Sequence, residues 1–364
     1  MKIGSDLVDA DIHKARTLPA KFYRDTAYFG EIREKVFTRS WQFVGDQDVV
    51  KVPGSVYPFT LLEGCLDEPL LLTRDTADQV HLMSNVCTHR GTLVAEHAGC
   101  LQHLRCRYHG RRFGLDGRFL SMPEFQGAEG FPSKRDDLPQ VALGQWGRWF
   151  FAALEPPCPI EELLAEVEQR VGFLPFDQFV FDPTRSRDYL VRANWALYCD
   201  NYLEGFHIPF VHPSLAGALD YGSYRTEIFR WCNLQVGVAE GDDVEIFDLP
   251  ESSPDCGQKI AAYYFWVFPN LMLNFYPWGL SVNVVKPLAV DRTRVSFLSW
   301  VYDASKLEDS AGAQIDRVER EDEEVVESVQ RGMRSRLYDR GRYSPKREQG
   351  PHHFHRLLLE LLRR

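Results

Sequence analysis

The spacing of apolar positions divides the chain into a strand-rich first part and a mixed second part. Segment 158–171 has Pro159 where the first turn of a helix tolerates proline, and then repeats apolar residues at helical spacing. This change of period predicts a domain boundary near residue 156. Before it, short apolar runs broken by Gly, Pro and Asp predict strands at residues 55–62, 68–74, 79–86 and 147–154.

The second part combines a strand hairpin with two helices. Residues 280–302 alternate apolar and polar side chains around the turn-like stretch 290–293, as paired antiparallel strands do. Residues 306–335 are a long helical candidate, because Gly and Pro are absent from 313 to 331. Residues 352–364 predict a terminal helix. We therefore expect an α+β protein.

Composition excludes several classes of protein. The chain has 364 residues, 44% of them apolar, which is enough for two domains with their own cores. A net charge of -10 argues against nucleic acid or an anionic membrane as a partner, although it leaves room for a local basic patch. Eight cysteines are too few for a disulfide scaffold, and the N-terminus has no apolar signal segment. We expect a cytoplasmic protein with reduced thiols and no membrane-spanning segment.

Two short stretches each contain a cysteine and a histidine. Cys87-x-His89 is followed after sixteen residues by Cys106-x-x-His109. Thiolate and imidazole are good ligands for zinc or iron, and two loops can bring four of them together. A structural Cys₂His₂ zinc site and an iron–sulfur cluster both remain open on this spacing.

A second group of ligands lies in residues 194–215. Asp200, Glu204 and His207 are at i, i+4 and i+7, which predicts that they share one face of a helix. Pro209 should interrupt that helix, so that His212 can turn back towards the same point as His207. The alternative is an unremarkable pair of exposed or hydrogen-bonded histidines. The acids on the same face favour a metal site.

Asp322 is the candidate third ligand of that site. Two histidines and one carboxylate are a common ligand set of non-heme iron enzymes that activate O₂. Glu321, Glu323 and Glu324 are expected on a solvated face, and in the alternative to a metal site Asp322 lies there with them. Because burying an ionised carboxylate costs free energy, a metal would explain Asp322 in the middle of an apolar stripe. The stripe consists of Ile315, Val318, Val325, Val329 and Met333.

These motifs together resemble the catalytic α subunits of Rieske non-heme iron oxygenases, the ring-hydroxylating oxygenase family. The resemblance rests on the two Cys/His loops, on residues 200–215 and on residues 321–335. It implies a [2Fe–2S] cluster in which Cys87 and Cys106 bind one iron, while His89 and His109 bind the other. It also implies a mononuclear Fe(II) ion held by His207, His212 and Asp322.

Two further stretches, residues 268–285 and 341–362, are more similar to the branch that contains choline, carnitine and glycine betaine oxygenases. The acid that bridges the two metal centres is usually aspartate in ring dihydroxylases and corresponds here to Glu204, which favours the same branch. One departure is Ala196, where the family has lysine. Its effect does not follow from the sequence.

The resemblance implies three regions: an N-terminal arm (1–39) that packs with the catalytic domain, a Rieske β domain (40–155), and a catalytic domain (156–364). The catalytic domain should have the helix-grip fold, a curved antiparallel sheet around a long helix. The family also implies a head-to-tail homotrimer, in which the cluster of one subunit reduces the iron of the next through the bridging acid.

The expected function is that of a terminal oxygenase that hydroxylates a small organic molecule with O₂. The chain lacks a Gly-rich dinucleotide motif, so NAD(P)H must act through a separate flavin/iron–sulfur reductase or a ferredoxin. Asn201 is expected to position O₂ or substrate near the iron. Monooxygenation or demethylation of a quaternary ammonium or betaine compound is favoured. The alternatives are a ring-hydroxylating dioxygenase for an aromatic acid, a Rieske electron carrier, and a zinc-stabilised binding protein.

Overall fold

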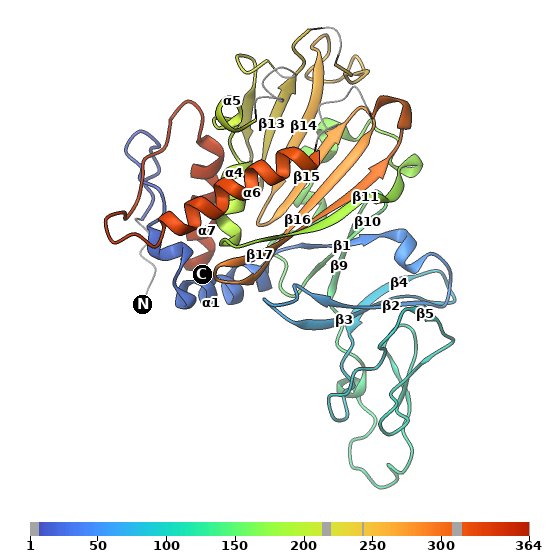
Figure 1. Cartoon of the computed structure of the whole chain (residues 1–364). Helices are drawn as coiled ribbons and strands as arrows, with labels where there is room; N and C mark the ends of the chain where they lie inside the picture. The colour runs from blue at the N-terminus through green and yellow to red at the C-terminus, as the bar shows by residue number, and fades with distance from the viewer. Residues whose placement is uncertain (1–6, 213–219, 242–243, 308–314, 364) are drawn as a thin grey trace. The chain divides into compact units, whose positions relative to one another are not determined.

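The chain folds into two compact units (Figure 1). One unit is Thr38–Ile160, and the other combines Met1–Phe37 with Glu161–Arg364. The computed structural model describes residues 7–212, 220–241, 244–307 and 315–363, without the side chain of Ile315. No helix within these residues is both long and apolar enough to cross a bilayer.

The unit 38–160 consists of antiparallel β-structure. The predicted strands at 55–62, 68–74, 79–86 and 147–154 are confirmed as β2 (Ser55–Leu61), β3 (Glu68–Arg74), β4 (Val80–Ser84) and β10 (Trp149–Ala153). The other strands are β1 (Gln42–Asp46), β5 (Gly99–Cys100), β6 (Leu104–Arg105), β7 (Arg112–Phe113), β8 (Phe119–Ser121) and β9 (Ala142–Trp146). They form sheets in the orders β4-β3-β2-β5, β1-β10-β9 and β6-β7-β8. Strands of two or three residues are too short to show a period, which is why the sequence did not predict β5 to β8.

The second unit contains one seven-stranded antiparallel sheet in the order β11-β17-β16-β15-β14-β13-β12. The predicted hairpin is confirmed as β16 (Gly279–Ala289) and β17 (Arg292–Val301). Every residue of β15 is buried, so this strand appears in the sequence as a nearly continuous apolar run. The remaining strands are β11 (Val180–Val191), β12 (Arg225–Ile228), β13 (Cys232–Val238), β14 (Ile260–Val267) and β15 (Leu271–Tyr276).

A long helix, α6 (Ile315–Gly332), lies across one face of this sheet and packs against α4 (Trp195–Tyr202) and β11 (Figure 1). This arrangement confirms the predicted α+β helix-grip fold. The prediction that α6 extends over 306–335 was too long at both ends: Ala304–Lys306 is a separate turn capped by Asp303, and residues 308–314 lie outside the described residues. The other helices are α1 (Thr26–Lys35), α2 (Ile160–Leu163), α3 (Ala165–Val171), α5 (Ile208–Val211) and α7 (Gln349–Arg363).

Two candidate metal sites

The two Cys/His loops have the same backbone design. In each loop the cysteine N–H donates to the carbonyl five residues on, and the glycine N–H donates back to the cysteine carbonyl at 3.0 Å. Gly91 and Gly110 stand four residues after their cysteines, with φ of 76° and 74°. A left-handed φ of this kind favours glycine, so the two stretches need glycine at this position to turn. Cys87 and Cys106 are thereby held as equivalent members of twin loops.

The four side chains separate into a thiol pair and an imidazole pair. Cys87 and Cys106 are 3% and 2% exposed and belong to an apolar core with Leu71, Met83 and Phe113. Burial raises the pKa of the Cys87 thiol, and the adjacent Cys106 thiol acts in the same direction. The histidines lie nearer the surface, with the Nδ1 atoms of His89 and His109 only 3.2 Å apart.

This pairing fits a two-metal cluster better than a single zinc ion. Four ligands of one tetrahedral ion would all lie close together around it. Among the described residues, the one group of three or more His, Cys, Asp or Glu side chains whose ligand atoms all lie within 4.8 Å is His207, His212 and Asp322. The donor set in the loops, with sulfur at one end and nitrogen at the other, suits the two irons of a [2Fe–2S] cluster.

Asp136 and Arg111 fasten the two loops to each other. The carbonyl of Asp136 accepts from the Thr88 hydroxyl at 2.8 Å in the first loop and from the Arg111 guanidinium at 3.1 Å, just beyond the second. The Asp136 carboxylate accepts from the same guanidinium at 2.7 Å and from Ser133. Burial raises the pKa of Asp136, but the bonds from Arg111 and Ser133 outweigh this effect and leave it below its usual value. The contact between Asp136 and Arg111 was not predictable from the sequence, because Asp136 is distant from both loops in the chain.

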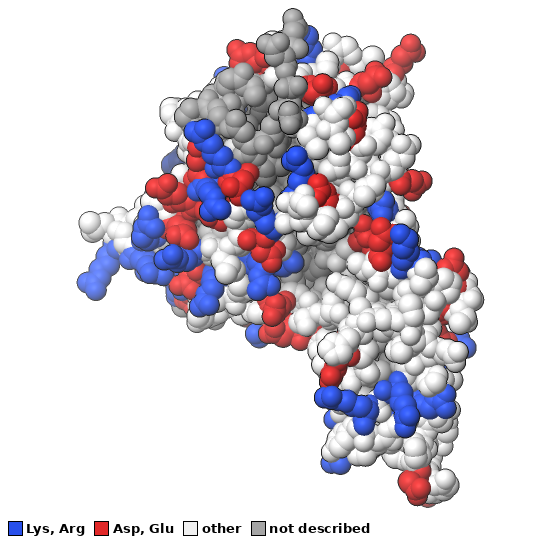
Figure 2. All heavy atoms as spheres, turned by 45° about the vertical axis from the view of Figure 1, so that its right-hand side comes forward, with Lys and Arg blue, Asp and Glu red and all other residues white. Residues whose placement is uncertain are grey.

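Exposed arginines lie within or beside the two loops that carry the imidazoles. These are Arg90, Arg105 and Arg107. Figure 2 shows several Lys and Arg side chains close together on this unit. The net negative charge of the chain is therefore compatible with a local basic surface near His89 and His109.

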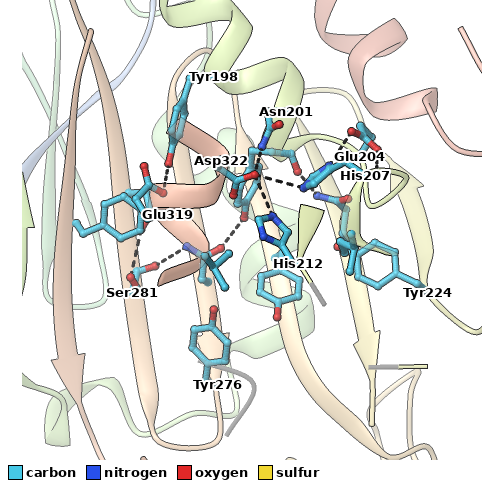
Figure 3. A pocket seen from close by; sticks show the side chains of 18 residues that line it. Tyr198, Asn201, Glu204, His207, His212, Tyr224, Tyr276, Ser281, Glu319 and Asp322 are labelled. Carbon is cyan, nitrogen blue, oxygen red and sulfur yellow. Dashed lines mark hydrogen bonds and ion pairs between the residues drawn. The ribbon is translucent and has the colours of Figure 1, made fainter. Parts of the chain in front are cut away.

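The second site lies in the other unit and is built by two histidines and one aspartate (Figure 3). The Nε2 atoms of His207 and His212 lie 3.5 and 3.0 Å from the same Asp322 oxygen. His212 is 1% exposed. Two imidazole nitrogens and one carboxylate oxygen directed at one point suit non-heme Fe(II).

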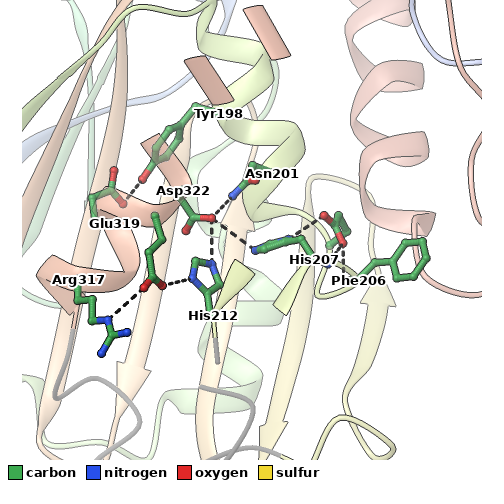
Figure 4. A network of polar contacts seen from close by, with 10 residues as sticks. Tyr198, Asn201, Phe206, His207, His212, Arg317, Glu319 and Asp322 are labelled. Atoms are coloured by element: carbon green, nitrogen blue, oxygen red, sulfur yellow. Dashed lines mark hydrogen bonds and ion pairs between the residues drawn. The ribbon is translucent and has the colours of Figure 1, made fainter. Parts of the chain in front are cut away.

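A second carboxylate orients each histidine (Figure 4). Nδ1 of His207 lies 2.7 Å from Glu204, and Nδ1 of His212 lies 2.8 Å from Glu321. Carboxylates of this kind fix the ring orientation and tautomer of metal-binding histidines. Burial lowers the pKa of His212, but the bonds to Asp322 and Glu321 outweigh this effect and raise it. The hydrogen bond with His212 lowers the pKa of Glu321.

The local structure around His207 differs from the prediction. Helix α4 ends at Tyr202, so Asp200, Glu204 and His207 do not share one helical face. The chain turns because the Glu204 carboxylate accepts from the N–H groups of Phe206 and His207. Pro209 does not end a helix either: it lies in the first turn of α5, where a missing N–H costs little. The histidines therefore flank a single short helix.

Asp200 faces away from the candidate iron ligands. Its carboxylate accepts from the Tyr23 hydroxyl at 2.9 Å, and its other oxygen lies 2.8 Å from Nε2 of His355, so that the N-terminal segment, α4 and α7 meet here. The prediction that Asp200 faces the same point as Glu204 and His207 was therefore wrong. Ala196, also on α4, is fully buried, so a lysine here would have to carry its charged end out of the core.

The buried line of α6 is shifted from the predicted apolar stripe. Val329 is 38% exposed, whereas Val326 and Met333 are buried, and two polar residues, Glu319 and Gln330, share that buried line. Gln330 accepts from the Asn194 N–H at 2.7 Å, and Glu319 accepts from the Tyr198 hydroxyl at 2.6 Å. A stripe assigned from apolar residues alone misses buried polar positions of this kind. Asp322 stands on the edge of this line, and its side chain is 16% exposed.

The prediction that Glu321, Glu323 and Glu324 lie on a solvated face was also partly wrong. Glu324 is exposed as expected, but Glu321 bonds to His212 and Glu323 is only partly exposed. Asn201, which was expected to position O₂ or substrate, donates its amide to the Asp322 carboxylate at 2.6 Å. Asn201 also lines the pocket, so its geometry suits both the orientation of Asp322 and contact with a bound molecule.

A pocket opens beside His207, His212 and Asp322, inside the seven-stranded sheet unit (Figure 3). Gly205 is required for its wall, since a Cβ atom there would lie 2.6 Å from the Tyr224 ring. The described lining residues include three carboxyl side chains, five tyrosines and no Lys or Arg. The tyrosines are Tyr198, Tyr202, Tyr224, Tyr264 and Tyr276.

Family comparisons agree with this geometry. A family model described as the ring hydroxylating alpha subunit (catalytic domain) matches residues 176–364, and one described as the Rieske [2Fe-2S] domain matches residues 40–132. The chain is 32% identical to a chloroplastic choline monooxygenase of Arabidopsis thaliana, over 95% of this chain and 83% of that protein. It is 28% identical to the carnitine monooxygenase oxygenase subunit of Escherichia coli K12, over 97% and 96%.

Solved structures show the same fold. The quaternary ammonium Rieske monooxygenase CntA matches 99% of both chains, with a TM-score of 0.80 at 21% identity. Naphthalene 1,2-dioxygenase from Rhodococcus sp. matches 95% of this chain and 94% of that one, with a TM-score of 0.76 at 20% identity.

These matches exclude the zinc-stabilised binding protein and the simple electron carrier. The protein is an oxygenase that uses a Rieske [2Fe–2S] cluster, mononuclear iron and O₂, and acts on a small molecule with electrons from a separate reductase or ferredoxin. The chain belongs to the ring-hydroxylating α subunits, the catalytic subunits of Rieske non-heme iron oxygenases.

Proposed function

We propose that this chain is the terminal oxygenase for a small quaternary ammonium compound, which it hydroxylates at a carbon next to nitrogen. The observation that carries the proposal is the tyrosine-rich pocket, which opens on His207, His212 and Asp322 and has no Lys or Arg among its described lining residues. Tyrosine faces attract cations that cannot donate hydrogen bonds. The similarity to choline and carnitine monooxygenases supports the same substrate class.

The twin loops would hold the cluster. Cys87 and Cys106 would bind one iron from the buried side, and His89 and His109 would bind the other through their Nδ1 atoms, which already face each other. The exposed imidazole end and the nearby arginines would receive electrons from a reductase with an acidic surface. The assignment of the cluster region to about residues 40–155 belongs to this proposal.

The mononuclear iron would be held by His207, His212 and Asp322. Iron in such a set, when bound, supplies the activation of O₂ for insertion into a C–H bond. Glu204 and Glu321 keep the two Nε2 atoms directed at one point, and Asn201 fixes the Asp322 carboxylate through its amide. The pocket walls orient the substrate and limit access of water.

Glu204 would also be the bridging acid. One oxygen holds Nδ1 of His207, and the other accepts from the backbone. The carboxylate lies on the side of His207 away from Asp322 (Figure 3), where it would meet an electron donor that docked there. A head-to-tail homotrimer would bring the cluster of one subunit to Glu204 of the next. The trimer and a cytoplasmic location remain predictions.

The test is substrate-dependent consumption of O₂ and NADH by the purified protein with a surrogate reductase. We expect stimulation by at least one quaternary ammonium compound among choline, carnitine and glycine betaine, with one hydroxylated or demethylated product per O₂. Stimulation by benzoate or another aromatic acid alone would overturn the proposal in favour of ring hydroxylation.

A further inference from the structure

Glu319 is the one carboxyl residue among the described pocket-lining residues that the proposed chemistry does not use. It lies on α6, lines the pocket and is 4% exposed. One carboxyl oxygen accepts from the Tyr198 hydroxyl at 2.6 Å, while Oε1, equally buried, has no hydrogen-bond partner among the described residues. Figure 3 shows Glu319 and Tyr198 at the side of the pocket away from His207 and Glu204.

A buried carboxyl without a cation costs free energy, and the described residues around the pocket offer Glu319 no Lys or Arg. Burial raises the pKa of Glu319 well above its usual value, even though the Tyr198 hydrogen bond acts in the opposite direction. The described lining includes Glu204, Glu319 and Asp322 without a Lys or Arg. Segments 213–219 and 308–314 contain neither Lys nor Arg in their sequence. The raised pKa means that Glu319 holds a proton while the pocket is empty, and a cation bound beside it would favour the ionised carboxylate.

The sum of charges in a site that holds iron also favours a bound cation. With a cation beside it Glu319 would be ionised, and the lining carboxylates Glu204, Glu319 and Asp322 would then bring three negative charges against the two positive charges of iron(II). One negative charge remains, and a monocation balances it. A substrate that carries its own carboxylate would bring no net positive charge, and its carboxylate would meet acidic side chains without a basic partner.

The aromatic wall suits a cation that cannot donate hydrogen bonds. The Tyr264 and Tyr276 rings are 5.9 Å apart in an edge-on arrangement, and Tyr276 stacks on Trp278 at 5.1 Å. These rings are held by one another and are available to pack around methyl groups. Tyr202 is fixed by donating to Asn274 at 2.7 Å. Attraction to ring faces is the usual means of binding a quaternary ammonium group.

We propose that Glu319 is the counter-charge for the substrate's ammonium group, and that the substrate is a choline-like monocation rather than a zwitterion such as carnitine or glycine betaine. This inference rests on the proposed function and specifies its substrate class. Glu319 is thus a specificity-determining residue, which separates cations from zwitterions of similar size.

The experiment is calorimetric binding to the protein loaded with cluster and iron, without O₂. The probes are choline, its neutral isostere 3,3-dimethylbutan-1-ol, and glycine betaine. We expect choline to bind at least about tenfold more tightly than either of the others, since removal of one member of a buried charge pair is costly. In Glu319→Gln, choline should bind at least about tenfold more weakly, while the neutral isostere changes by less than about twofold.

Matched variants separate this effect from a loss of structure. The introduced amide keeps an acceptor for Tyr198, and unchanged cluster absorption and iron content show that the variant is folded. Glu323→Gln changes a partly buried carboxyl on the same helix that is not among the pocket-lining residues, and should leave all three affinities unchanged. If Glu319→Gln does not fold, Glu319→Asp, which keeps the charge, must retain the preference for choline over its isostere.

The outcomes distinguish this inference from the proposed function. If glycine betaine or carnitine binds as tightly as choline, or if Glu319→Gln leaves choline binding unchanged, the inference is wrong while oxygenation of quaternary ammonium compounds can still stand. If choline binds as expected but no quaternary ammonium compound supports O₂ consumption, the proposed reaction fails and the cation site remains.

Discussion

The two candidate metal sites are built in opposite ways. The Cys/His site stands on twin loops whose shape comes from backbone hydrogen bonds and two left-handed glycines, and its imidazole end is near the solvent. The His/His/Asp site takes its side chains from helices and their ends, and each histidine is held by a carboxylate. His212 is almost completely buried, whereas His109 is exposed.

This difference follows from what each site has to do. A site that exchanges electrons needs an exposed edge, and its potential depends on the ligands and on their hydrogen bonds. A site that oxidises a substrate must exclude water and keep coordination positions open, which requires a pocket and a small number of rigidly held ligands. Loss of a ligand at one site should therefore leave metal binding at the other unchanged.

Removing the Asp322 carboxylate should have the largest effect. In Asp322→Ala, two imidazoles alone cannot hold the iron, and we expect loss of the mononuclear metal with turnover reduced at least about 1,000-fold. The visible absorption of the cluster should stay, because the twin loops lie in the other unit. Metal analysis and absorption spectra check this result. Full iron content in the variant would remove Asp322 from the ligand set.

The reciprocal change is Cys87→Ser. A hydroxyl is a far weaker iron ligand than a thiolate, and this position lies on an apolar core, so we expect the [2Fe–2S] colour and the reduced-state EPR signal to be lost. The mononuclear site should still bind iron when it is supplied. Loss of iron binding at both sites would show that the two units depend on each other for folding.

Much of both candidate sites was predictable from the local sequence. The candidate cluster ligands come in two pairs, each within one tight turn that ends in glycine, so the local sequence contains the whole pattern. His207 and His212 are also local. The sequence even predicted Asp322, from the conflict between a carboxylate and an apolar stripe, although Val329 proved exposed and the buried line passes through Glu319 and Gln330.

Residues that act through contacts distant in sequence were not predictable. Glu321 meets His212 across 109 positions, and Asp136 meets Arg111 across 25. No periodic pattern records such a pair, because it arises only when the units have folded. The end of α4 was not predicted for another reason. The Glu204 carboxylate accepts from a backbone N–H and so competes with continuation of the helix, and helical spacing in the sequence does not show this competition.

The carboxylate of Glu204 should connect the sites without holding a metal. Glu204→Gln removes a charged partner of His207 but keeps an acceptor for the backbone. We expect both metals to remain bound, while electron transfer from the reduced cluster to the iron slows at least about tenfold. Stopped-flow reoxidation of the cluster in the presence of substrate measures this rate. An unchanged rate would assign Glu204 to local structure alone.

Glu321 tests how far the iron site depends on its outer carboxylates. In Glu321→Gln, His212 loses its charged partner, and the affinity for Fe(II) should fall by about 10- to 100-fold. Iron titration of metal-free protein gives this value, and Glu324→Gln, an exposed acid on the same helix, is the matched control. Equal iron affinity in the two variants would show that the Glu321 contact does not orient the ligand.

Asp136 tests how far the two Cys/His loops depend on the contacts that fasten them together, and the expected effect is smaller. In Asp136→Asn, one carbonyl oxygen replaces two carboxylate oxygens that accept from Arg111 and Ser133, so the buried guanidinium loses part of its bonding. We expect the free energy of unfolding of this unit to fall by about 2 kcal/mol near pH 7. Denaturation followed by cluster absorption measures it, and Asp116→Asn, which removes an exposed ion pair with Arg118, should change it by less than about 0.5 kcal/mol.

The pH dependence of the difference in unfolding free energy between the wild type and Asp136→Asn identifies its cause. The pKa of Asp136 is lowered in the folded protein, so its carboxylate contributes stability above the ordinary value of 3.8, and this contribution is lost as the pH falls through the lowered pKa. The gap between the wild type and Asp136→Asn should therefore be constant at neutral pH and close in acid, below about pH 4. A gap that persisted in acid would assign the effect to the shape of the side chain instead of its charge.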